Sequence, residues 1–468
     1  MTLLLLSDPI TKGSETEMGH IQKFTSLRHD FPEFTYDSFS TFVKESDLVV
    51  TYKFIQSDDI IFEPSVIFRN CPAESLNTSN IKAALFNLGM IEIASYYKAC
   101  CSPRIIVKAG ALDEEQLSFW KKLIYRGLGE FLYRNGIETK EEDLFDIIPE
   151  SQTHFEPALS DLEPGFIIPV GGGKDSVVTL ELLKGTDCRP LILNPREASV
   201  QSARISGYDD YIRIERSIDP LLLKLNEKGF LNGHTPFSAL LGFVSAAASL
   251  IYSRRYIALS NENSANEGNT FFSGIDINHQ YSKSYEAEEA LHGYIRKYIS
   301  RSVYYFSFLR PLNELAIARL FSRFGDHFST FRSCNVGSKE NKWCLKCPKC
   351  LFTYIMLSPF NSDEDLMNIF GKNLLDDTEL EPVFLELCGF SGIKPFECVG
   401  TVREVRAALA KKTDISEKGD LPVLLKIFSE REKDRLPVYR SDFVKLIEEF
   451  SEENLLPDDL KMILEKNL

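Results

Sequence analysis

One short segment constrains the fold of this chain more than any other: Gly171-Gly172-Gly173-Lys174-Asp175-Ser176. The apolar residues 166–170 before it predict a buried strand, and the apolar spacing of residues 177–184 after it predicts a helix. Glycines let backbone N–H groups converge, and the N-terminus of the following helix adds unpaired donors and the positive end of its dipole. The segment therefore predicts a strand–loop–helix unit that binds an anion, most simply a phosphate group.

The spacing of the glycines separates this loop from two common phosphate-binding loops. A Walker A loop needs Gly, four residues and then Gly-Lys-Ser/Thr, and a dinucleotide fingerprint needs Gly-x-Gly-x-x-Gly. The segment resembles instead the pyrophosphate loop (PP-loop) of the ATP pyrophosphatase superfamily, Ser-Gly-Gly-x-Asp-Ser, with Gly171 in place of the first serine. An ordinary glycine-rich turn between a strand and a helix is the alternative.

The 468 residues are enough for two or three domains. Residues 1–150 contain short β-type runs and helical patterns, which predict an N-terminal α+β domain. In residues 151–360 strand and helix patterns alternate, which predicts a parallel sheet wrapped by helices, with ligands at the carboxyl ends of the strands. Residues 361–468 predict amphipathic helices, among them 421–430 and 441–450. The fold class is therefore α/β.

Within this plan, the central region has four predicted strands and one long predicted helix. The strands are expected at residues 166–170, 190–194, 211–214 and 256–260, and the helix at 237–252. The acidic, proline-containing segment 141–164 predicts a linker between the first two domains.

Charge and composition exclude several classes of protein. The net charge of −15 argues against a large nucleic-acid interface, which needs clustered Lys and Arg. Leu3–Leu6 has neither the length nor the basic flank of a signal peptide, and no apolar stretch reaches the length of a membrane span. We therefore expect a cytoplasmic protein with a small-molecule substrate and without a membrane or nucleic-acid partner.

Four of the ten cysteines are clustered with the spacing C-x9-C-x2-C-x2-C: Cys334, Cys344, Cys347 and Cys350. Two residues between ligands permit a tight turn that aims both thiolates at one ion. The spacing predicts a structural Zn²⁺ site, because four protein ligands leave no open position for water. An iron–sulfur cluster fits the same spacing, and chance clustering of free cysteines is the remaining alternative.

Polar segments follow the predicted strands, at the sheet edge where the glycine loop is expected. Residues 260–269, including Glu267, could bind Mg²⁺ through oxygen ligands or form a plain polar turn. In the next polar segment, His279, Lys283 and Glu286 could supply proton-transfer groups.

Three further residues have both a structural and a functional interpretation. Arg310 could bind a carboxylate or phosphate, or it could pair with Glu314. Thr235 and Thr401 are predicted helix N-caps, although the irregular segment 394–401 interrupts a helical region in the way that functional loops do.

Taken together, these segments resemble the UDP-N-acetylmuramoyl-L-alanyl-L-glutamate epimerase family. The resemblance covers nearly the whole chain and rests on residues 95–98, 171–176, 232–238, 278–284, 343–350 and 394–401. Its most specific strings are Asn-His-Gln-Tyr-Ser-Lys-Ser and Pro-Phe-Glu-Cys-Val-Gly-Thr. The glycine loop and the cysteine cluster alone also resemble the 7-cyano-7-deazaguanine synthase branch of the superfamily.

The resemblance implies an adenine-nucleotide alpha-hydrolase-like (PP-loop) domain and an ATP-dependent reaction in peptidoglycan precursor synthesis. The terminal L-glutamate of UDP-MurNAc-L-Ala-L-Glu would become D-glutamate through an acyl-adenylate, with release of AMP and diphosphate. The implied residue roles are phosphate binding by Gly171, Gly172, Gly173 and Ser176, charge neutralisation by Lys174, Mg²⁺ placement by Asp175 or Glu267, and proton transfer by His279, Lys283 or Glu286.

Two other functions fit the same residues. The first is another adenylating PP-loop ligase or synthase, such as a 7-cyano-7-deazaguanine synthase-like enzyme, which would change the mass of its substrate. The second is a zinc-stabilised nucleotide-binding protein without turnover, which would release no AMP.

Overall fold

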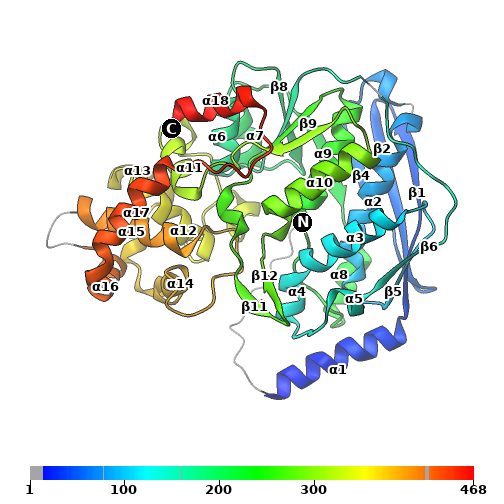
Figure 1. Cartoon of the computed structure of the whole chain (residues 1–468), viewed down its shortest axis with the longest axis horizontal. Helices are drawn as coiled ribbons and strands as arrows, with labels where there is room; N and C mark the ends of the chain where they lie inside the picture. The colour runs from blue at the N-terminus through cyan, green and yellow to red at the C-terminus, as the bar shows by residue number, and fades with distance from the viewer. Residues whose placement is uncertain (1–13, 77, 160, 417–420) are drawn as a thin grey trace.

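A computed structural model describes residues 14–76, 78–159, 161–416 and 421–468, so Leu3–Leu6 lie outside the described residues. The backbone is organised around one sheet of eleven strands (Figure 1). The strand order is β13 (Tyr304–Ser307), β10 (Tyr256–Leu259), β7 (Phe166–Pro169), β8 (Cys188–Leu193), β9 (Ile212–Ser217), β4 (Ser65–Phe68), β2 (Asp47–Ser57), β1 (Glu33–Lys44), β5 (Arg104–Val107) and β6 (Asp146–Pro149), and β3 (Ile60–Phe62) pairs with β2.

The strands from β13 to β9 run parallel to one another, which confirms the parallel sheet predicted from the alternation of strands and helices. Successive side chains of these strands point to opposite faces of the sheet. Ile167 and Ile257 enter one hydrophobic core, whereas Ile168 and Ala258 enter a second. Both faces are therefore covered, as expected for apolar parallel strands.

The N-terminal strands belong to the same sheet. β4 pairs antiparallel with β9, with Ser65 opposite Ser217 and Phe68 opposite Ile214, and β2 and β1 continue the antiparallel part. The sheet thus continues past the boundary predicted at residue 150. The division of the chain at residues 150 and 360 stays a prediction.

The prediction of a linker was wrong for its first part. Residues 141–149 form α5 (Glu141–Leu144) and β6, and β6 pairs parallel with β5, with Ile148 opposite Ile106. The acidic residues and prolines suggested a loop, but Ile147 and Ile148 provide the β-branched side chains that favour an edge strand.

Two long apolar helices, α2 (Lys82–Tyr97) and α9 (Phe237–Ile251), pack against each other in the first core. Almost all of their side chains are buried, which explains why neither helix has a polar stripe. Thr235 does not cap α9 as predicted, because the N-cap position is Pro236, which has no side-chain hydrogen bond. Thr401 does cap α15 (Val402–Ile415), in a capping box with Glu404.

The C-terminal region is helical, as predicted, and contributes a large share of the second core (towards the red end of the colour range in Figure 1). The two predicted helices correspond to α16 (Val423–Arg431) and α17 (Leu436–Glu448), the second of which begins earlier than expected. α17 packs against α15 and against α11 (Glu314–Phe321), which follows β13. The C-terminal helices therefore reach the edge of the sheet where the glycine loop lies.

The structure also has further α-helices, a two-stranded hairpin and several short 3₁₀ helices, two of which lie near the site. The α-helices, the hairpin and these two short helices are α1 (Ser14–Asp30), α3 (Glu114–Gly127), α4 (Gly129–Arg134), α6 (Lys174–Leu182), α7 (Glu197–Ile205), α8 (Pro220–Glu227), α10 (Tyr285–Tyr298), α12 (Pro348–Leu357), α13 (Asp363–Phe370), α14 (Glu381–Leu387), α18 (Asp458–Asn467), the hairpin of β11 (Thr270–Phe272) and β12 (Ile275–Ile277), and the short helices η3 (Asn263–Asn266) and η4 (Tyr281–Lys283).

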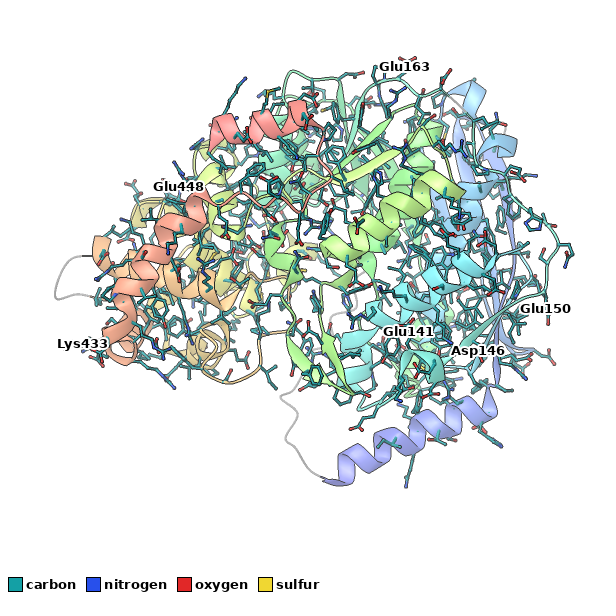
Figure 2. All side chains as sticks on the ribbon, viewed as in Figure 1. Glu141, Asp146, Glu150, Glu163, Lys433 and Glu448 are labelled. Carbon is teal, nitrogen blue, oxygen red and sulfur yellow. The ribbon has the colours of Figure 1, made fainter. Side chains whose placement is uncertain are left out.

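Most charged side chains lie outside the buried core, whereas Lys174, Arg310 and Glu314 are among those that are buried. Figure 2 labels six charged residues that are not buried, of which five are acidic, in keeping with the net charge of −15: Glu141, Asp146, Glu150, Glu163, Lys433 and Glu448. None of the helices in the described ranges combines the length and the apolar composition needed to cross a membrane.

Candidate active site

The glycine loop connects β7 to α6, as predicted. Gly172 has a φ of +84°, in the left-handed region that favours glycine. A Cβ at this position would lie 2.7 Å from backbone atoms of Ala198 and Ser199. The carbonyl of Gly172 also accepts a 2.8 Å hydrogen bond from the N–H of Arg332. The loop is therefore held between two backbone segments that leave no room for a side chain.

A residue with a side chain loses about 1–2 kcal/mol in the left-handed conformation. Replacing Gly172 by alanine is expected to lower the free energy of unfolding by more than this, because the backbone of Ala198 and Ser199 must also move. Gly171→Ala is the matched control, since nothing lies within 4 Å of a Cβ at Gly171. Urea unfolding of both variants checks the prediction. Equal stability of the two variants would contradict it.

The lysine of the loop is buried among carboxylates. The Lys174 ammonium forms ion pairs with the carboxylates of Asp175 and Glu314, and the side chain of Glu314 is itself buried at the start of α11. Burial alone would lower the pKa of Lys174, but the charges of Asp175 and Glu314 raise it above its usual value. Burial raises the pKa of Glu314 to about 7, against the opposing effect of Lys174. The loop therefore carries a charged lysine whose partners include one carboxyl group near its titration point.

A cysteine from the far end of the chain lies beside this loop. Lys283 donates to the Sγ atom of Cys398 over 3.5 Å, and Lys349, on α12, donates to the Cys398 carbonyl. His279 also forms a hydrogen bond with the Cys398 side chain. We call Cys398, His279, Lys283 and Lys349 the Cys398 cluster.

The cations of the Cys398 cluster control the charge of the thiol. Burial favours the neutral thiol, but Lys283, His279 and Lys349 prevail and lower the pKa of Cys398 to about 5. Conversely, although burial opposes it, Cys398 and two nearby carboxylates raise the pKa of Lys283. These two carboxylates belong to Glu262, which follows β10, and to Asp175 of the loop. The Cys398 cluster and the glycine loop therefore form one electrostatic unit.

Next to the Cys398 cluster, Glu130 lies between two histidines. Its Oε2 atom is 2.5 Å from Nδ1 of His279 and 3.7 Å from Nδ1 of His234, and the two rings are 4.3 Å apart. The direct contact between Glu130 and His279 leaves no space for an ion between them. We therefore interpret Glu130 and His279 as an ion pair with His234 beside it, and not as metal ligands.

Glu130 and the two histidines beside it have widely different pKa values. Burial lowers the pKa of His234 to about 3, and the charge of His279 acts in the same direction. For His279, burial is outweighed by Cys398 and Glu130, which raise its pKa to about 10. For Glu130, burial is outweighed by His279, His234 and Arg134, which lower its pKa to about 2. At neutral pH His234 is neutral, whereas His279 and Glu130 are charged.

The Glu130–His279 pair predicts a pH window of stability. Glu130 has a pKa lowered from 4.5, so its contribution is complete above pH 4.5 and is lost as the pH falls towards 2. His279 has a pKa raised from 6.5, so its contribution is complete below pH 6.5 and is lost as the pH rises towards 10. The loss of unfolding free energy in Glu130→Gln should therefore be largest between about pH 4.5 and 6.5. Urea unfolding across pH 3–10 checks this, and a constant difference would contradict it.

Arg310 differs from both of its predicted roles. Its guanidinium is fully buried and pairs with Glu288 over 2.7 Å, not with Glu314. It also donates to the backbone carbonyls of Glu262 and Lys283, each over 2.5 Å. With all of these partners around it, Arg310 is not placed to bind a substrate anion. It holds together the two loops that carry Glu262 and Lys283.

Two predicted site residues lie away from this centre. Glu267 pairs with Lys394 over 3.2 Å, and two-fifths of its side chain is exposed. Glu286 lies on the exposed side of α10, where it pairs with Lys122 over 2.6 Å. Lys174, Asp175, His279 and Lys283 are brought together, whereas Glu267 and Glu286 have their ion-pair partners elsewhere.

The four clustered cysteines converge as predicted. Three of their Sγ–Sγ distances are 3.5 Å (Cys347–Cys350), 3.7 Å (Cys344–Cys350) and 3.9 Å (Cys334–Cys347). A tetrahedron around one ion with metal–sulfur bonds of about 2.3 Å has edges of about 3.8 Å. In an iron–sulfur cluster the four cysteines are divided among two or four irons, which would place several of the sulfurs further apart. The group can therefore hold a single metal ion.

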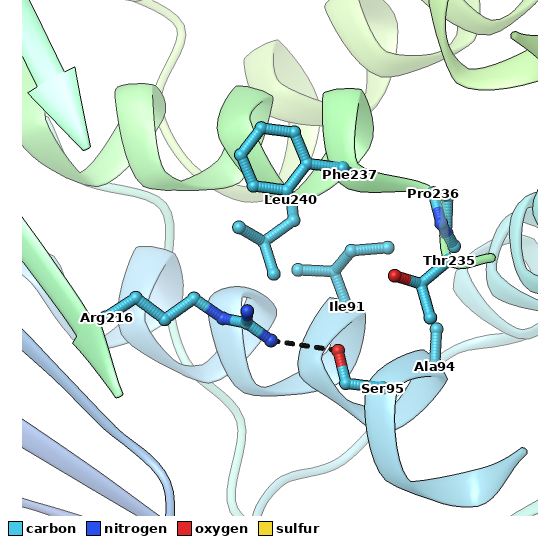
Figure 3. Close-up of a pocket in the computed structure, with 8 residues that line it drawn as sticks. All are labelled: Ile91, Ala94, Ser95, Arg216, Thr235, Pro236, Phe237 and Leu240. Atoms are coloured by element: carbon cyan, nitrogen blue, oxygen red, sulfur yellow. Dashed lines mark hydrogen bonds between the residues drawn. The ribbon is translucent and has the colours of Figure 1, made fainter. Parts of the chain in front are cut away.

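An open basic cleft lies beside the glycine loop, at the carboxyl ends of β8 and β9. It has a volume of 510 Å³ and is lined by Asn194, Pro195, Arg196, Arg213, Glu215, Arg216, Ser217 and Lys339. A second, smaller pocket lies between α2 and α9 and holds no more than a water molecule (Figure 3). Arg216 borders both, and its 2.9 Å hydrogen bond to Ser95 is drawn in Figure 3.

Four residues of the centre were not assigned a role of their own from the sequence: Glu262, Glu314, Lys349 and Cys398. Each belongs to a segment that had been singled out, but nothing in the local pattern distinguishes it from its neighbours. For Cys398 one signal was available, since an unclustered cysteine lies in a loop that interrupts helices.

Comparison with known proteins identifies relatives along most of the chain. The sequence model described as MurL N-terminal domain matches residues 25–308, and the one described as MurL C-terminal domain matches residues 328–438. No solved structure matches the chain, so the assignment to the PP-loop superfamily stays a prediction.

Three curated relatives carry the name UDP-N-acetyl-alpha-D-muramoyl-L-alanyl-L-glutamate epimerase. The protein from a Micromonospora species is 34% identical over 405 residues, which is 84% of this chain and 89% of the relative. Those from Xanthomonas oryzae pv. oryzae and Salinispora tropica are each 33% identical, over 77% and 84% of this chain and 81% and 87% of their own lengths.

Proposed function

The chain belongs to the MurL family, and on that premise we propose that it is an ATP-dependent epimerase. Its substrate would be the compound in its relatives' name, UDP-N-acetyl-alpha-D-muramoyl-L-alanyl-L-glutamate, whose terminal L-glutamate would become D-glutamate. AMP and diphosphate would be the other products. The names of the relatives support this function over a PP-loop ligase or a 7-cyano-7-deazaguanine synthase-like enzyme.

The need for ATP follows from the chemistry of the substrate. A free carboxylate resists loss of its α-proton, because the resulting carbanion would add a second negative charge to the same group. Joining the carboxylate to AMP removes that charge and makes the carbonyl electron-withdrawing. An ordinary side-chain base can then take the proton, and hydrolysis of the acyl-adenylate afterwards releases the acid.

One observation carries the proposal: the glycine loop after β7 lies next to a cluster of ionisable side chains, at the carboxyl end of a parallel sheet. The charges of Lys349 and Lys283, two residues of the Cys398 cluster, interact with the carboxylate of Asp175 in the loop. A carboxyl group activated at the loop would therefore lie next to groups that can move a proton.

The glycine loop would hold the phosphates of ATP. The N-terminus of α6 and Gly171 to Ser176 supply backbone donors, and Lys174 would neutralise charge on the departing diphosphate. Asp175 is better placed than Glu267 to help bind Mg²⁺, because Glu262 and Glu314 lie within the same electrostatic unit. Mg²⁺ would supply additional neutralisation of phosphate charge there.

The basic cleft would take the UDP portion of the substrate. Its lining has three arginines and one lysine, of which Arg216 is held by Glu92 and Arg213 pairs with Glu215. Arg196 and Lys339 are therefore the cations of the cleft that would bind an anion. A diphosphate suits such a lining, because arginine binds phosphate oxygens in a bidentate manner. The cleft lies beside the glycine loop, so a substrate anchored there could extend its peptide end towards the Cys398 cluster.

The cysteine cluster would hold one structural Zn²⁺. Elemental analysis of the purified protein should give about one zinc per chain and no iron, because all four thiolates fit one tetrahedral ion. Cys347→Ser should lose the metal and lower the urea midpoint of unfolding, since binding of a structural metal contributes to folding. Iron with acid-labile sulfide in the protein as purified would contradict the zinc assignment.

The function is tested with ATP, Mg²⁺ and UDP-MurNAc-L-Ala-L-Glu. We expect AMP release, a product of unchanged mass and D-glutamate after acid hydrolysis and chiral chromatography. UDP-MurNAc-L-Ala, which lacks the glutamate, is the control and should give no AMP. A product of changed mass would indicate a ligase or synthase instead. No AMP with the complete substrate would rule the epimerase out.

A further inference from the structure

We propose that Cys398 is a catalytic residue of this epimerase, the base that removes the α-proton of the activated glutamate. The inference rests on the function proposed above and adds to it the identity of the proton acceptor. It replaces the three bases suggested by the sequence, His279, Lys283 and Glu286.

The three earlier candidates are poorly suited to accept a proton. Burial is outweighed by charged neighbours at both His279 and Lys283, and both pKa values are raised, for His279 to about 10. Both groups are thus already protonated at neutral pH. The carboxylate of Glu286 points to the surface and pairs with Lys122.

The surroundings of Cys398 favour the opposite charge state. Its Sγ atom accepts the 3.5 Å hydrogen bond of Lys283, and His279, whose Nδ1 is taken by Glu130, leaves its other ring nitrogen for the thiol. The charged groups that act on Cys398 are Lys283, His279, Lys349 and the adjacent Glu397. Three cations oppose one carboxyl group, whose own pKa is raised by burial and by Cys398. A thiolate is therefore the stable form.

Other buried cysteines of the chain show what happens without such cations. Burial raises the pKa of Cys100 to about 12 and that of Cys188 to about 11. Cys398 is also only half-buried, whereas Cys100 and Cys188 are buried. Among these three cysteines only Cys398 combines a lowered thiol pKa with a residue that is not fully buried, which are features of a reactive cysteine.

The position of Cys398 fits the place where the activated glutamate must form. Lys283 and Lys349 act on both Asp175 of the glycine loop and the thiol of Cys398. An acyl group joined to AMP at the loop is bonded directly to the α-carbon. The α-proton therefore has to be released within reach of the groups that border the loop.

The proton transfer balances without any further reagent. The thiolate forms an S–H bond while the Cα–H bond breaks, and the electron pair moves towards the carbonyl oxygen of the acyl-adenylate to give an enolate. A second, protonated acid then forms the new Cα–H bond on the opposite face, which inverts the configuration. The thiol returns its proton to solvent and the acid takes one up, so no net proton is consumed.

The test follows adenylation and proton transfer separately, in D₂O with UDP-MurNAc-L-Ala-L-Glu. Diphosphate–ATP exchange reports acyl-adenylate formation, and mass spectrometry reports deuterium at Cα. We expect the wild type to show both. Cys398→Ser and Cys398→Ala should keep the exchange but lose deuterium incorporation and D-glutamate formation by about 10²–10⁴-fold. Serine keeps the size and hydrogen bonds of the side chain, so the fold of this variant should be unchanged.

Cys188→Ala is the matched control, because Cys188 begins β8, at the end of the strand opposite to the site. It should keep both activities. As a second measurement, iodoacetamide should alkylate Cys398 of the wild type already at pH 6, and Lys283→Gln should move the onset of alkylation to higher pH. Deuterium incorporation in Cys398→Ala within tenfold of the wild type would overturn the proposal. If the wild type itself forms no AMP, the epimerase function fails, which is a separate outcome.

Discussion

Asp175→Asn is expected to reduce ATP-dependent AMP release by about 10²–10³-fold or more while leaving the fold intact. Asn keeps the shape of the side chain but removes the charge next to Lys174. The fold should survive because Lys174 keeps its second ion pair, with Glu314, so that no buried charge is left alone. Without the charge of Asp175, which raises the pKa of Glu314, that pKa should fall. AMP release, measured by chromatography with the complete substrate, checks the prediction.

The control for Asp175→Asn is Glu114→Gln, which also removes a carboxylate from the first turn of a helix but at an exposed position. Glu114→Gln should release AMP at the wild-type rate. Both variants should have similar urea midpoints of unfolding. Any difference should be no larger than the small stabilisation that a carboxylate gives to a helix N-terminus. Wild-type AMP release by Asp175→Asn would refute the assignment of the loop to ATP.

The contrast between the loop and Cys398 shows which features a sequence reveals. The strand, the glycines and the helix around Asp175 are adjacent in the chain, so their pattern was sufficient to predict the local structure. The contact of Lys283 with Cys398 joins residues 115 positions apart, and that of Lys174 with Glu314 joins residues 140 apart. Such contacts depend on the packing of whole layers, which no local periodicity encodes.

The same reason explains the missed continuity of the sheet. β4 and β9 are each short strands whose own residues predict only a strand, and their pairing joins Phe68 to Ile214 across the predicted linker. The four cysteines could be predicted as a group, because metal ligands close together in the chain have a characteristic spacing. The partners of Arg310 could not, since a buried arginine has the same local sequence pattern as one that binds a phosphate.

Arg310→Met is expected to lower the free energy of unfolding by about 3–5 kcal/mol, because it leaves the buried carboxylate of Glu288 without a counter-charge. The two backbone carbonyls that Arg310 bonds, those of Glu262 and Lys283, would also lose a donor. One of these carbonyls belongs to Lys283, a member of the Cys398 cluster, and the other to Glu262, which acts on Lys283. Activity should therefore fall together with stability. The loss of stability is the larger of the two expected effects, and the urea midpoint of unfolding measures it.

Two comparisons separate the charge from the packing of Arg310. In the double variant Arg310→Met/Glu288→Gln, the neutral amide can still accept the 2.9 Å hydrogen bond that Glu288 receives from the N–H of Ser307, so the double variant should be more stable than Arg310→Met alone. Arg104→Met, which breaks a 2.8 Å pair with Glu33 whose side chains are both 50% exposed, should change stability by less than about 1 kcal/mol. A double variant no more stable than Arg310→Met would show that the loss comes from the two carbonyls. Arg310 would then act mainly as a hydrogen-bonding tie between the loops of the site.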